Sequence, residues 1–408
     1  MKILILTQWY PPEPALLIQE LAQELSSKGN DVTVLTGFPN YPLGRVYADY
    51  RIRFWQHETL EGIRVIRVPL YPNHSQSGVK RLFNYLSFAL SASLLGLWLA
   101  PRPDAIFVYH PPLTIGLSAW VLSRLWRVGF VYQVQDMWPE TLRATGMIKN
   151  HHLLSITGRF AKWVYSKASS ILVISPGFRK NLIDKGVPAQ KITFIPNWTE
   201  GGNLENITPN NELAESLGMS SRFNIMFAGN IGEAQSLETA LDAAKLLDDL
   251  VDTQFVFVGA GISLDRLKNI VQDQGITNVK FLGRFPQKAM PSLYALADVL
   301  FVHLKDDPLF RITIPHKIIT YLGVGKPILA AIAGDSADII QETGAGIVCP
   351  PGDAQALARA IRSLRAMSVD ERTIMGERGL CAASAKYNRK NIVIEIWTLL
   401  EKASRANC

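Results

Sequence analysis

A strand, a glycine-containing loop and an amphipathic helix follow one another in residues 222–243, RFNIMFAGNIGEAQSLETALDA. A glycine-rich turn lets backbone N–H groups approach an anion, and the helix after it directs the positive end of its dipole to the same place. The chain opens with a similar unit, in which strands at 2–7 and 32–36 flank a helix that ends at Gly29. One such unit in each half predicts two α/β lobes that face each other across a cleft, with a phosphate-bearing ligand in it.

Strand and helix patterns alternate through most of the chain. The remaining strands of the first half are expected at 63–69, 105–109, 130–135, 171–174 and 192–195. Those of the second half are expected at 224–228, 255–258, 279–282, 299–302, 328–331 and 346–348. This alternation predicts parallel sheets covered by helices on both faces, a Rossmann-like architecture in each lobe.

The stretch 195–222 is rich in Pro, Gly, Asn and Ser, which is typical of a linker. A chain of 408 residues is long enough for two or three domains. We therefore expect an N-terminal lobe at 1–195 and a C-terminal lobe at 196–385. A final helical segment at about 386–408 is expected to pack back on the first lobe.

The cysteines and the N-terminus bear on the compartment. Cys349, Cys381 and Cys408 have neither metal-site spacing nor a disulfide framework, which favours a reducing, cytoplasmic setting. Residues 1–6, MKILIL, are expected to be a buried strand. They contain one basic residue and are too short for the apolar region of a signal peptide.

Charge is distributed unequally between the two halves. Residues 1–200 hold 21 Lys and Arg against 12 Asp and Glu, a balance of +9, whereas residues 201–408 hold 21 against 23, a balance of −2. The basic half also contains the longest apolar run. Basic charge beside apolar surface favours an anionic membrane surface as a partner rather than nucleic acid. The alternative is ordinary solvated surface charge.

The apolar run 82–100, LFNYLSFALSASLLGLWLA, would span about 28 Å as a helix, just enough for a bilayer core. However, Asn84, Ser87 and Ser91 share one stripe, and an α/β lobe needs a helix here to cover its sheet. We therefore expect a helix with one face on the sheet and the other in contact with lipid, not a membrane span. Nearby cations expected at lipid headgroups are Lys80, Arg81, Arg102, Arg159, Lys162 and Lys167.

Three loops of the second half follow predicted strands, where ligands bind in open parallel sheets. Gly229, Asn230 and Gly232 belong to the first loop, and Gly259 begins a Gly-Ala-Gly sequence in the second. The third, Gly-Arg-Phe, places Arg284 and Phe285 where they can flank a nucleobase. Tight turns without a ligand are the alternative for the glycine loops.

The stretch 311–327, RITIPHKIITYLGVGKP, predicts a diphosphate site. A helix begins after Pro315 with His316 and Lys317, and Arg311 is close in sequence. A helix N-terminus with cationic side chains binds phosphate through its dipole and through charge-assisted hydrogen bonds. In the alternative, Lys317 is only an exposed residue of the first helical turn.

Several stretches together resemble the retaining GT-B glycosyltransferases of family four. In the second half they are FAGNIGEAQSLETALDAA, FLGRFPQ, PHKIITYLGVGKPI and AGIVCPPGD. In the first half YPPEP, VTVLTGFPNYPLGRVY, EGIRVIRVPLYP, SGVKRLFNYLSFALSA and QDMWPE resemble bacterial transferases that build O-antigen, capsule and colanic-acid-type polysaccharides. The resemblance covers nearly the whole chain.

The resemblance implies transfer of a sugar, with retention and without a metal ion or another cofactor, from a nucleotide diphosphate donor. The acceptor would be a polyprenyl-diphosphate-linked saccharide at the cytoplasmic membrane face, bound by the first lobe. In the second lobe, Gly229, Asn230 and Gly232 would face the donor's phosphates or sugar. Arg284 and Phe285 would frame the base, while Lys317 would neutralise the leaving diphosphate, together with Arg311 and the helix N-terminus.

The acceptor hydroxyl needs a base or an orienting group. Asp136 follows a predicted strand in QDMWPE and is the first candidate, unless the donor's own phosphate takes the proton and leaves Asp136 to orient a sugar. His110, in YHPP, is the second candidate, with capping of its loop as the alternative role. Glu13, after two prolines, is the third.

Two departures from the family pattern concern the donor and lobe closure. The family normally has two glutamates eight positions apart, but the second position is Thr320, and 301–341 contains no glutamate. Thr320 can bind a ribose or sugar hydroxyl more weakly than a carboxylate does. Relatives also tend to have a glycine-containing loop after the first strand, which is a few residues shorter here. Its loss would impair closure over the donor or mark an inactive copy.

Two other functions remain open at this point. A nucleotide-sugar epimerase shares the architecture but needs several acid and base groups, in which the second lobe is poor. A non-catalytic subunit that binds lipid-linked saccharide is the other. For a transferase, UDP is preferred over GDP because no carboxylate is evident to bind the guanine amino group. The subgroup resemblance points to an N-acetylated aminosugar, such as a fucosamine type.

Overall fold

The computed structural model describes residues 1–75, 77–148, 150–199 and 208–405. The chain divides into two compact units. Unit 1 contains Met1–Asn197 together with Arg389–Cys408, and unit 2 contains Trp198–Asn388. The division lies close to the expected boundary at 195/196, and the last helix belongs to unit 1 as expected. Part of the expected linker, 200–207, and Cys408 lie outside the described residues.

Unit 1 contains an eight-stranded sheet with the order β3-β4-β2-β1-β5-β6-β7-β8. Its strands are β1 (Lys2–Thr7), β2 (Asp31–Gly37), β3 (Gln56–Leu60), β4 (Ile63–Val68), β5 (Ala105–Tyr109), β6 (Phe130–Val134), β7 (Ser170–Val173) and β8 (Ile192–Phe194). All neighbours pair in parallel except β3 and β4, which are antiparallel. The expected strands of this half are confirmed, but β3 was not predicted. Its sequence QHETL is mostly polar and lies at the sheet edge, so it lacks the apolar pattern of a buried strand.

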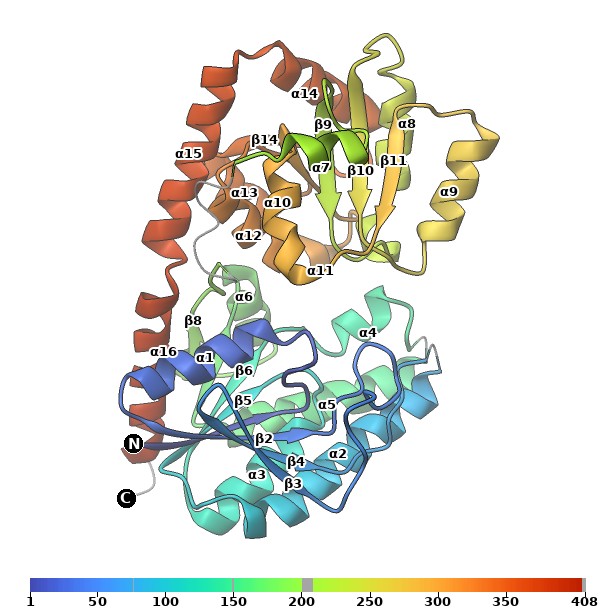
Figure 1. The fold of residues 1–408 in the computed structure, drawn as a ribbon. Helices are drawn as coiled ribbons and strands as arrows, with labels where there is room; N and C mark the ends of the chain where they lie inside the picture. Colours follow the sequence, from blue (N-terminus) through green and yellow to red (C-terminus); the bar gives the residue numbers. More distant parts are fainter. Residues whose placement is uncertain (76, 149, 200–207, 406–408) are drawn as a thin grey trace. The chain divides into compact units, whose positions relative to one another are not determined.

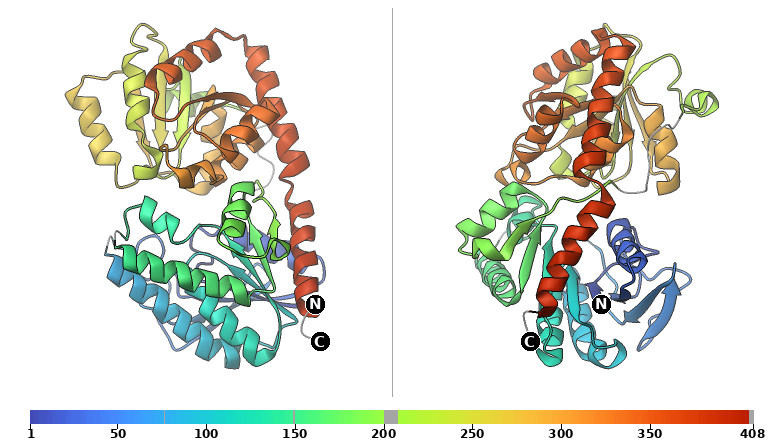
Figure 2. Two further views of the ribbon diagram at one scale, coloured as in Figure 1. Left: turned by 180° about the vertical axis from the view of Figure 1, so that it is seen from behind. Right: turned by 90° about the vertical axis from the view of Figure 1, so that its left-hand side faces the viewer.

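Helices cover both faces of this sheet (Figure 1). They are α1 (Leu16–Ser27), α2 (Gly78–Leu99), α3 (Ile115–Trp126), α4 (Glu140–Ala144), α5 (His151–Lys167), α6 (Pro176–Asp184) and α16 (Arg389–Arg405). α2 and α3 pack together on one face, with α5 against α3. α1 packs on the other face beside α16, which crosses β5 and β6 (Figure 2).

Helix α2 is long and apolar enough to cross a membrane, by length and composition alone. In the structure α2 packs on β2 and β4. Its own residues Tyr85, Phe88 and Ala92 are buried. The polar stripe lies on this covered side: Asn84 donates to the carbonyl of Tyr71 at 2.6 Å, and Ser91 donates to the carbonyl of Pro69. The expectation of a sheet-covering helix is confirmed.

Unit 2 contains a six-stranded parallel sheet with the order β11-β10-β9-β12-β13-β14. Its strands are β9 (Phe223–Ala228), β10 (Thr253–Val258), β11 (Val279–Gly283), β12 (Val299–His303), β13 (Ile328–Ala331) and β14 (Gly346–Cys349). Each coincides with an expected strand to within a few residues. The order is that of the Rossmann fold, so the expectation for this lobe is confirmed.

The helices of unit 2 are α7 (Asn211–Ser216), α8 (Glu238–Lys245), α9 (Leu264–Asp273), α10 (Met290–Ala295), α11 (Pro308–Arg311), α12 (His316–Val324), α13 (Asp335–Thr343), α14 (Ala354–Ala366) and α15 (Val369–Lys386). Successive side chains of β9 point to opposite faces of the sheet, and each face has its own hydrophobic cluster. Ile225 and Phe227 pack into a cluster with α8 and α14, whereas Met226 packs into a second cluster with α12 and α15.

The strand order reverses direction at one strand in each sheet. In unit 1, β1 lies between β2 and β5, and in unit 2, β9 lies between β10 and β12. Crevices at the carboxyl ends of such strands are where open α/β sheets bind ligands. These two edges therefore define where a site is to be sought in each unit.

Candidate active site

Lys317 provides a buried cation at the carboxyl edge of the unit 2 sheet. Its Nζ atom is buried and has no hydrogen-bond partner among the described residues. The same atom lies 3.6 Å from the centroid of the Phe227 ring. A Cβ atom added to Gly229 would be only 3.1 Å from this Nζ. Burial lowers the pKa of Lys317 to about 7. The alternative of a solvent-exposed Lys317 in the first helical turn is therefore wrong.

Tyr321, one turn further along α12, ties this helix to the end of β9. Its hydroxyl accepts from the N–H of Ala228 at 2.9 Å and donates to the Ala228 carbonyl at 3.3 Å. Tyr321 is fully buried. It therefore fixes the start of the glycine loop relative to the helix that carries Lys317.

The glycine loops after β9 and β10 pair with each other through their backbones. Gly229 N–H donates to Val258 and Ile231 N–H donates to Ala260, at 2.9 and 3.0 Å. A Cβ atom on Gly259 would lie 1.9 Å from the Gly229 carbonyl oxygen, and Gly259 has a φ of +145°. Gly259 is thus required for the close approach of the two loops. This packing accounts for a glycine at position 259 even if no ligand contacts it. Its predicted contact with the donor stays a prediction.

Gly232 and Asn230 complete the first loop. The Gly232 N–H donates to the side-chain oxygen of Gln235 at 3.1 Å. A Cβ atom on Gly232 would lie 2.8 Å from the side-chain nitrogen of Asn230. The loop is therefore held by its own residues in the shape that leaves Gly229 beside Lys317.

His303, at the end of β12, holds the same loop from the other side, and its role was missed in the sequence. Its Nδ1 lies 2.8 Å from the Gln235 carbonyl, and its Nε2 accepts from the N–H of Gly352 at 3.3 Å. Burial lowers the pKa of His303 to about 4, so the ring is neutral and donates from Nδ1. A histidine at the end of a predicted strand was the signal that could have revealed it.

The other polar residues predicted for the diphosphate site have partners inside the protein. Arg311 is exposed, and its guanidinium pairs with Asp306, with Nε donating at 3.0 Å. His316 Nε2 lies 3.0 Å from the Trp198 carbonyl, and its Nδ1 lies 3.3 Å from the Thr320 hydroxyl. Lys317 is therefore the member of this set that has no hydrogen-bond partner among the described residues.

Arg284 and Phe285 follow β11 at the same edge of the sheet. Arg284 is exposed, whereas Phe285 is half-buried and packs against the cluster on the α12 face of the sheet. The Gly283 carbonyl before them accepts from the Gly259 N–H at 2.8 Å, which links this segment to the glycine loops. Their predicted contact with a nucleobase stays a prediction.

In unit 1, Asp136 lies just after β6, at the carboxyl edge of the sheet. The residue is half-buried, and its carboxylate has no hydrogen-bond partner within the part of the chain that the structure describes. Burial raises the pKa of Asp136 to about 6. A carboxylate of this kind can accept a proton near neutral pH.

His110 lies after β5 and is almost fully buried between the rings of Tyr132 and Trp138, each with its centroid 5.8 Å away. Neither ring nitrogen has a partner among residues that the structure describes. Burial lowers the pKa of His110 to about 3, so the ring is neutral. The alternative role in capping the loop is wrong for the ring, because that role requires a hydrogen bond from it.

Glu13 organises the loops around β1. It accepts from the N–H groups of Tyr10, Asn40 and Tyr41, at 3.1, 2.8 and 2.8 Å. Burial raises the pKa of Glu13 to about 7, against the opposing effect of these three donors. Both carboxylate oxygens are occupied, so Glu13 positions two loops, and its predicted catalytic role stays a prediction.

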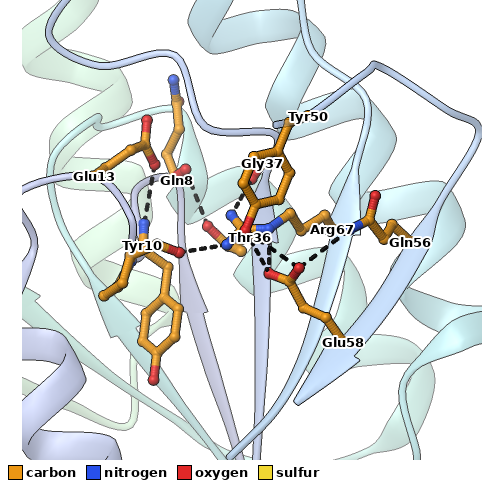
Figure 3. A network of polar contacts seen from close by, with 10 residues as sticks. Gln8, Tyr10, Glu13, Thr36, Gly37, Tyr50, Gln56, Glu58 and Arg67 are labelled. Carbon is orange, nitrogen blue, oxygen red and sulfur yellow. Dashed lines mark hydrogen bonds and ion pairs between the residues drawn. The ribbon is translucent and has the colours of Figure 1, made fainter. Parts of the chain in front are cut away.

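Arg67 lies beside this group and was not predicted as a site residue (Figure 3). Its side chain is fully buried, pairs with Glu58 at 2.6 Å and donates to the carbonyls of Gly37 and Pro11. An arginine inside the apolar pattern IRVIRV was the signal. Arg67 connects the segments after β1 and β2 to β3, so it stabilises the loops that contain Glu13.

Comparison with known proteins identifies the class. A family model described as "Glycosyl transferase 4-like domain" matches residues 14–198, and one described as "Glycosyl transferases group 1" matches residues 211–380. The chain is 29% identical over 377 residues to a putative colanic acid biosynthesis glycosyl transferase of Escherichia coli K12, covering 89% of this chain and 91% of the relative. It is 28% identical over 256 residues to a probable glycosyltransferase of Pseudomonas aeruginosa, covering 61% and 62%.

Solved structures agree in fold. HepE of Anabaena, in complex with UDP and glucose, superposes with a TM-score of 0.73 at 19% identity, over 98% of this chain and 99% of that one. Sucrose-phosphate synthase of Thermosynechococcus elongatus superposes with a TM-score of 0.73 at 17% identity, over 98% of each chain. The fold is that of the GT-B glycosyltransferases. The chain belongs to the glycosyltransferase group 1 family, with a first unit like glycosyltransferase 4, and this favours a transferase over an epimerase.

Proposed function

We propose that this glycosyltransferase transfers a sugar, with retention and without a metal ion, from a UDP-linked donor bound by unit 2 to a polyprenyl-diphosphate-linked saccharide bound by unit 1. The observation that supports the donor role best is the buried Nζ of Lys317 beside Gly229, which has no hydrogen-bond partner in the described part of the chain. Leaving a buried cation without a partner is costly unless a ligand supplies the opposite charge. A diphosphate at the N-terminus of α12 would supply it.

In the proposed reaction, the bond between the sugar's C1 and the diphosphate oxygen breaks, and the acceptor oxygen bonds to C1 on the same face. Negative charge grows on the leaving UDP, where Lys317 and the first N–H groups of α12 stabilise it. The acceptor hydroxyl loses its proton to the departing phosphate oxygen or to Asp136. In the first case Asp136 orients the acceptor.

The choice of donor and pathway is supported by relatives. HepE was crystallised with UDP-glucose, and the Escherichia coli relative is named for colanic acid biosynthesis. A further relative, from Erwinia amylovora, is named for amylovoran biosynthesis and is 26% identical over 53% of this chain. We therefore place this protein in bacterial surface polysaccharide (O-antigen or capsule) biosynthesis. An N-acetylated aminosugar, such as a fucosamine type, is the donor sugar proposed from the subgroup resemblance.

Peripheral attachment to the inner face of the cell membrane fits such an acceptor. The outer face of α2 exposes a stripe of large apolar side chains, among them Leu90, Leu94 and Trp98, the last 84% exposed. Lys80 and Arg81 lie at one end of the helix, and Arg102 follows the other end. An amphipathic helix of this kind binds in the interface of an anionic bilayer. We propose that α2 docks there with its axis along the surface.

The test is a two-part assay on the whole protein. Calorimetric titration with UDP, GDP and their common sugar conjugates identifies the donor nucleotide. Transfer of radiolabelled sugar into the lipid fraction of bacterial membranes then tests the reaction. UDP binding with labelled lipid product is expected. UDP binding without product, given a panel of UDP-aminosugars and hexoses, would favour the non-catalytic subunit, and no nucleotide binding would overturn the donor site.

A further inference from the structure

A cavity lies entirely within unit 1, between α4, α5 and the segment after α6. Its volume is about 460 Å³, which lies within the range of small-molecule sites. Trp138, Leu154 and Val187 form apolar parts of its wall. The sequence motifs did not indicate this cavity, because its residues come from three separate segments.

The cavity has a strongly positive rim. Arg143, Arg159, Lys162 and Lys185 line it, with Glu140 as the acidic residue, so the charges sum to +3. Lys185 is paired with Glu140 at 2.5 Å. The other three cations have no acidic partner among the residues that the structure describes, which leaves them available to an anion.

Tyr165 lines the cavity and adds an uncharged, buried donor to its wall. The residue is 3% exposed, and its hydroxyl has no hydrogen-bond partner in the described part of the chain. Burial, with a contribution from Glu140, raises the pKa of Tyr165, so the phenol keeps its proton at neutral pH. A buried donor without an acceptor is costly in a folded protein, and a bound oxyanion would satisfy it.

The cavity adjoins two candidate catalytic residues, Asp136 and His110, and an apolar surface. Trp138 lines the cavity and also contacts the ring of His110, and Asp136 lies two positions before it. On α5, Leu153 and Ile156 are 50% and 52% exposed, next to Leu154 of the cavity wall. A ligand with an anionic group and an apolar chain would therefore find a complement for each part.

We propose that this cavity binds the diphosphate and the first prenyl units of the lipid-linked acceptor. The cations and the Tyr165 hydroxyl bind the diphosphate, while the apolar wall receives the prenyl carbons. This assignment rests on the proposed acceptor class and adds the place where unit 1 holds it. It also explains how the saccharide would be held next to Asp136 and His110, because the diphosphate anchors its reducing end.

The experiment titrates the whole protein with farnesyl diphosphate, a short soluble prenyl diphosphate, and follows binding by calorimetry. Arg159→Ala/Lys162→Ala removes two cations of the rim, both exposed, so the fold is kept. Arg179→Ala/Lys180→Ala removes two exposed cations of α6 that do not line the cavity, so its change in net charge is the same. The first variant is expected to bind at least tenfold more weakly, and the second to bind like wild type.

Tyr165→Phe gives a second readout that does not depend on net charge. It removes only the hydroxyl, and we expect it to weaken farnesyl diphosphate binding while leaving thermal stability unchanged or higher. Inorganic diphosphate and farnesol distinguish the two parts of the ligand. Each is expected to bind more weakly than farnesyl diphosphate by at least tenfold.

Several results would overturn the assignment. They are no binding of farnesyl diphosphate, equal loss of binding in the α6 variant, or equal binding of inorganic diphosphate, which would leave a simple anion site. UDP binding is measured on the same samples. If UDP binds normally but farnesyl diphosphate does not, this inference fails alone. If farnesyl diphosphate binds and UDP does not, the donor part of the proposed function fails instead.

Discussion

The ammonium group of Lys317 lies 3.6 Å from the centroid of the Phe227 ring, with no hydrogen-bond acceptor for it among the described residues. A cation–π contact compensates a desolvated ammonium only partly, by an amount on the order of 2 kcal/mol. The buried ammonium therefore lowers the stability of the folded protein and favours binding of an anion. Residues that bind a charged ligand often reduce folding stability in this way.

Lys317→Met should weaken UDP binding by about 10- to 100-fold, because a charge-assisted hydrogen bond is worth about 1.5–3 kcal/mol. The same change should leave the unliganded protein as stable as wild type or more stable, because it removes a buried cation that has no partner among the residues the structure describes. Calorimetry and thermal unfolding measure the two effects. A large loss of stability would mean that Lys317 has a structural role instead.

The pH dependence of stability provides an independent check on Lys317. Burial lowers its pKa from 10.5 to about 7, so between these values the unfolded chain binds a proton that the folded protein does not. Stability should therefore rise with pH from about 7 to 10.5 through this group. Denaturant unfolding across this range should show a smaller rise in Lys317→Met than in wild type. UDP affinity should fall above about pH 7, where the free ammonium loses its proton.

Asp136→Asn should lower the rate of sugar transfer by about 10²-fold or more, the usual contribution of a positioned base, without changing UDP affinity. Because the pKa of Asp136 is raised to about 6, the wild-type rate should climb with pH through that value, and this limb should vanish in the variant. Asp31→Asn is the control, since Asp31 is exposed at the start of β2, at the opposite edge of the sheet. A pH profile unchanged by Asp136→Asn would exclude it as the base.

Tyr321→Phe should destabilise the protein by about 1–3 kcal/mol, because it leaves the buried N–H of Ala228 without its acceptor. Tyr132→Phe is the matched comparison. Tyr132 is also fully buried, but its hydroxyl has no partner among described residues. Its removal should be neutral or stabilising. Denaturant unfolding of both variants decides the matter, and equal effects would contradict the role given to the Tyr321 hydroxyl.

Leu94→Ser/Trp98→Ser should reduce binding to anionic phospholipid vesicles by at least tenfold, because burial of each large apolar side chain contributes roughly 1.5–3 kcal/mol. These residues are 59% and 84% exposed on α2. Val251→Ser/Ile374→Ser is the control, since these residues are 85% and 49% exposed in unit 2. Vesicle co-sedimentation at low and high salt measures the effect. Equal binding of the two variants would contradict docking through α2.

The fold was predictable because its signals are local. Buried parallel strands form short apolar runs, and their glycine-containing ends are visible in the sequence. β3 escaped prediction because an edge strand needs little apolar sequence and gains its register from β4. The shape of the first glycine loop was equally hidden, since His303 and Gly259 hold it from distant positions.

By itself, the sequence determined the two Rossmann-like units, the family, and the positions of the loops that follow the strands. These follow from periodicity and short motifs, which act over a few residues. Only the tertiary structure decided which polar side chains are paired: Lys317 is buried with no hydrogen-bond partner among the described residues, whereas Arg311 is paired with Asp306. It also formed the cationic cavity beside Tyr165 from segments far apart in the chain. Burial and pairing depend on contacts between such segments, so no local pattern encodes them.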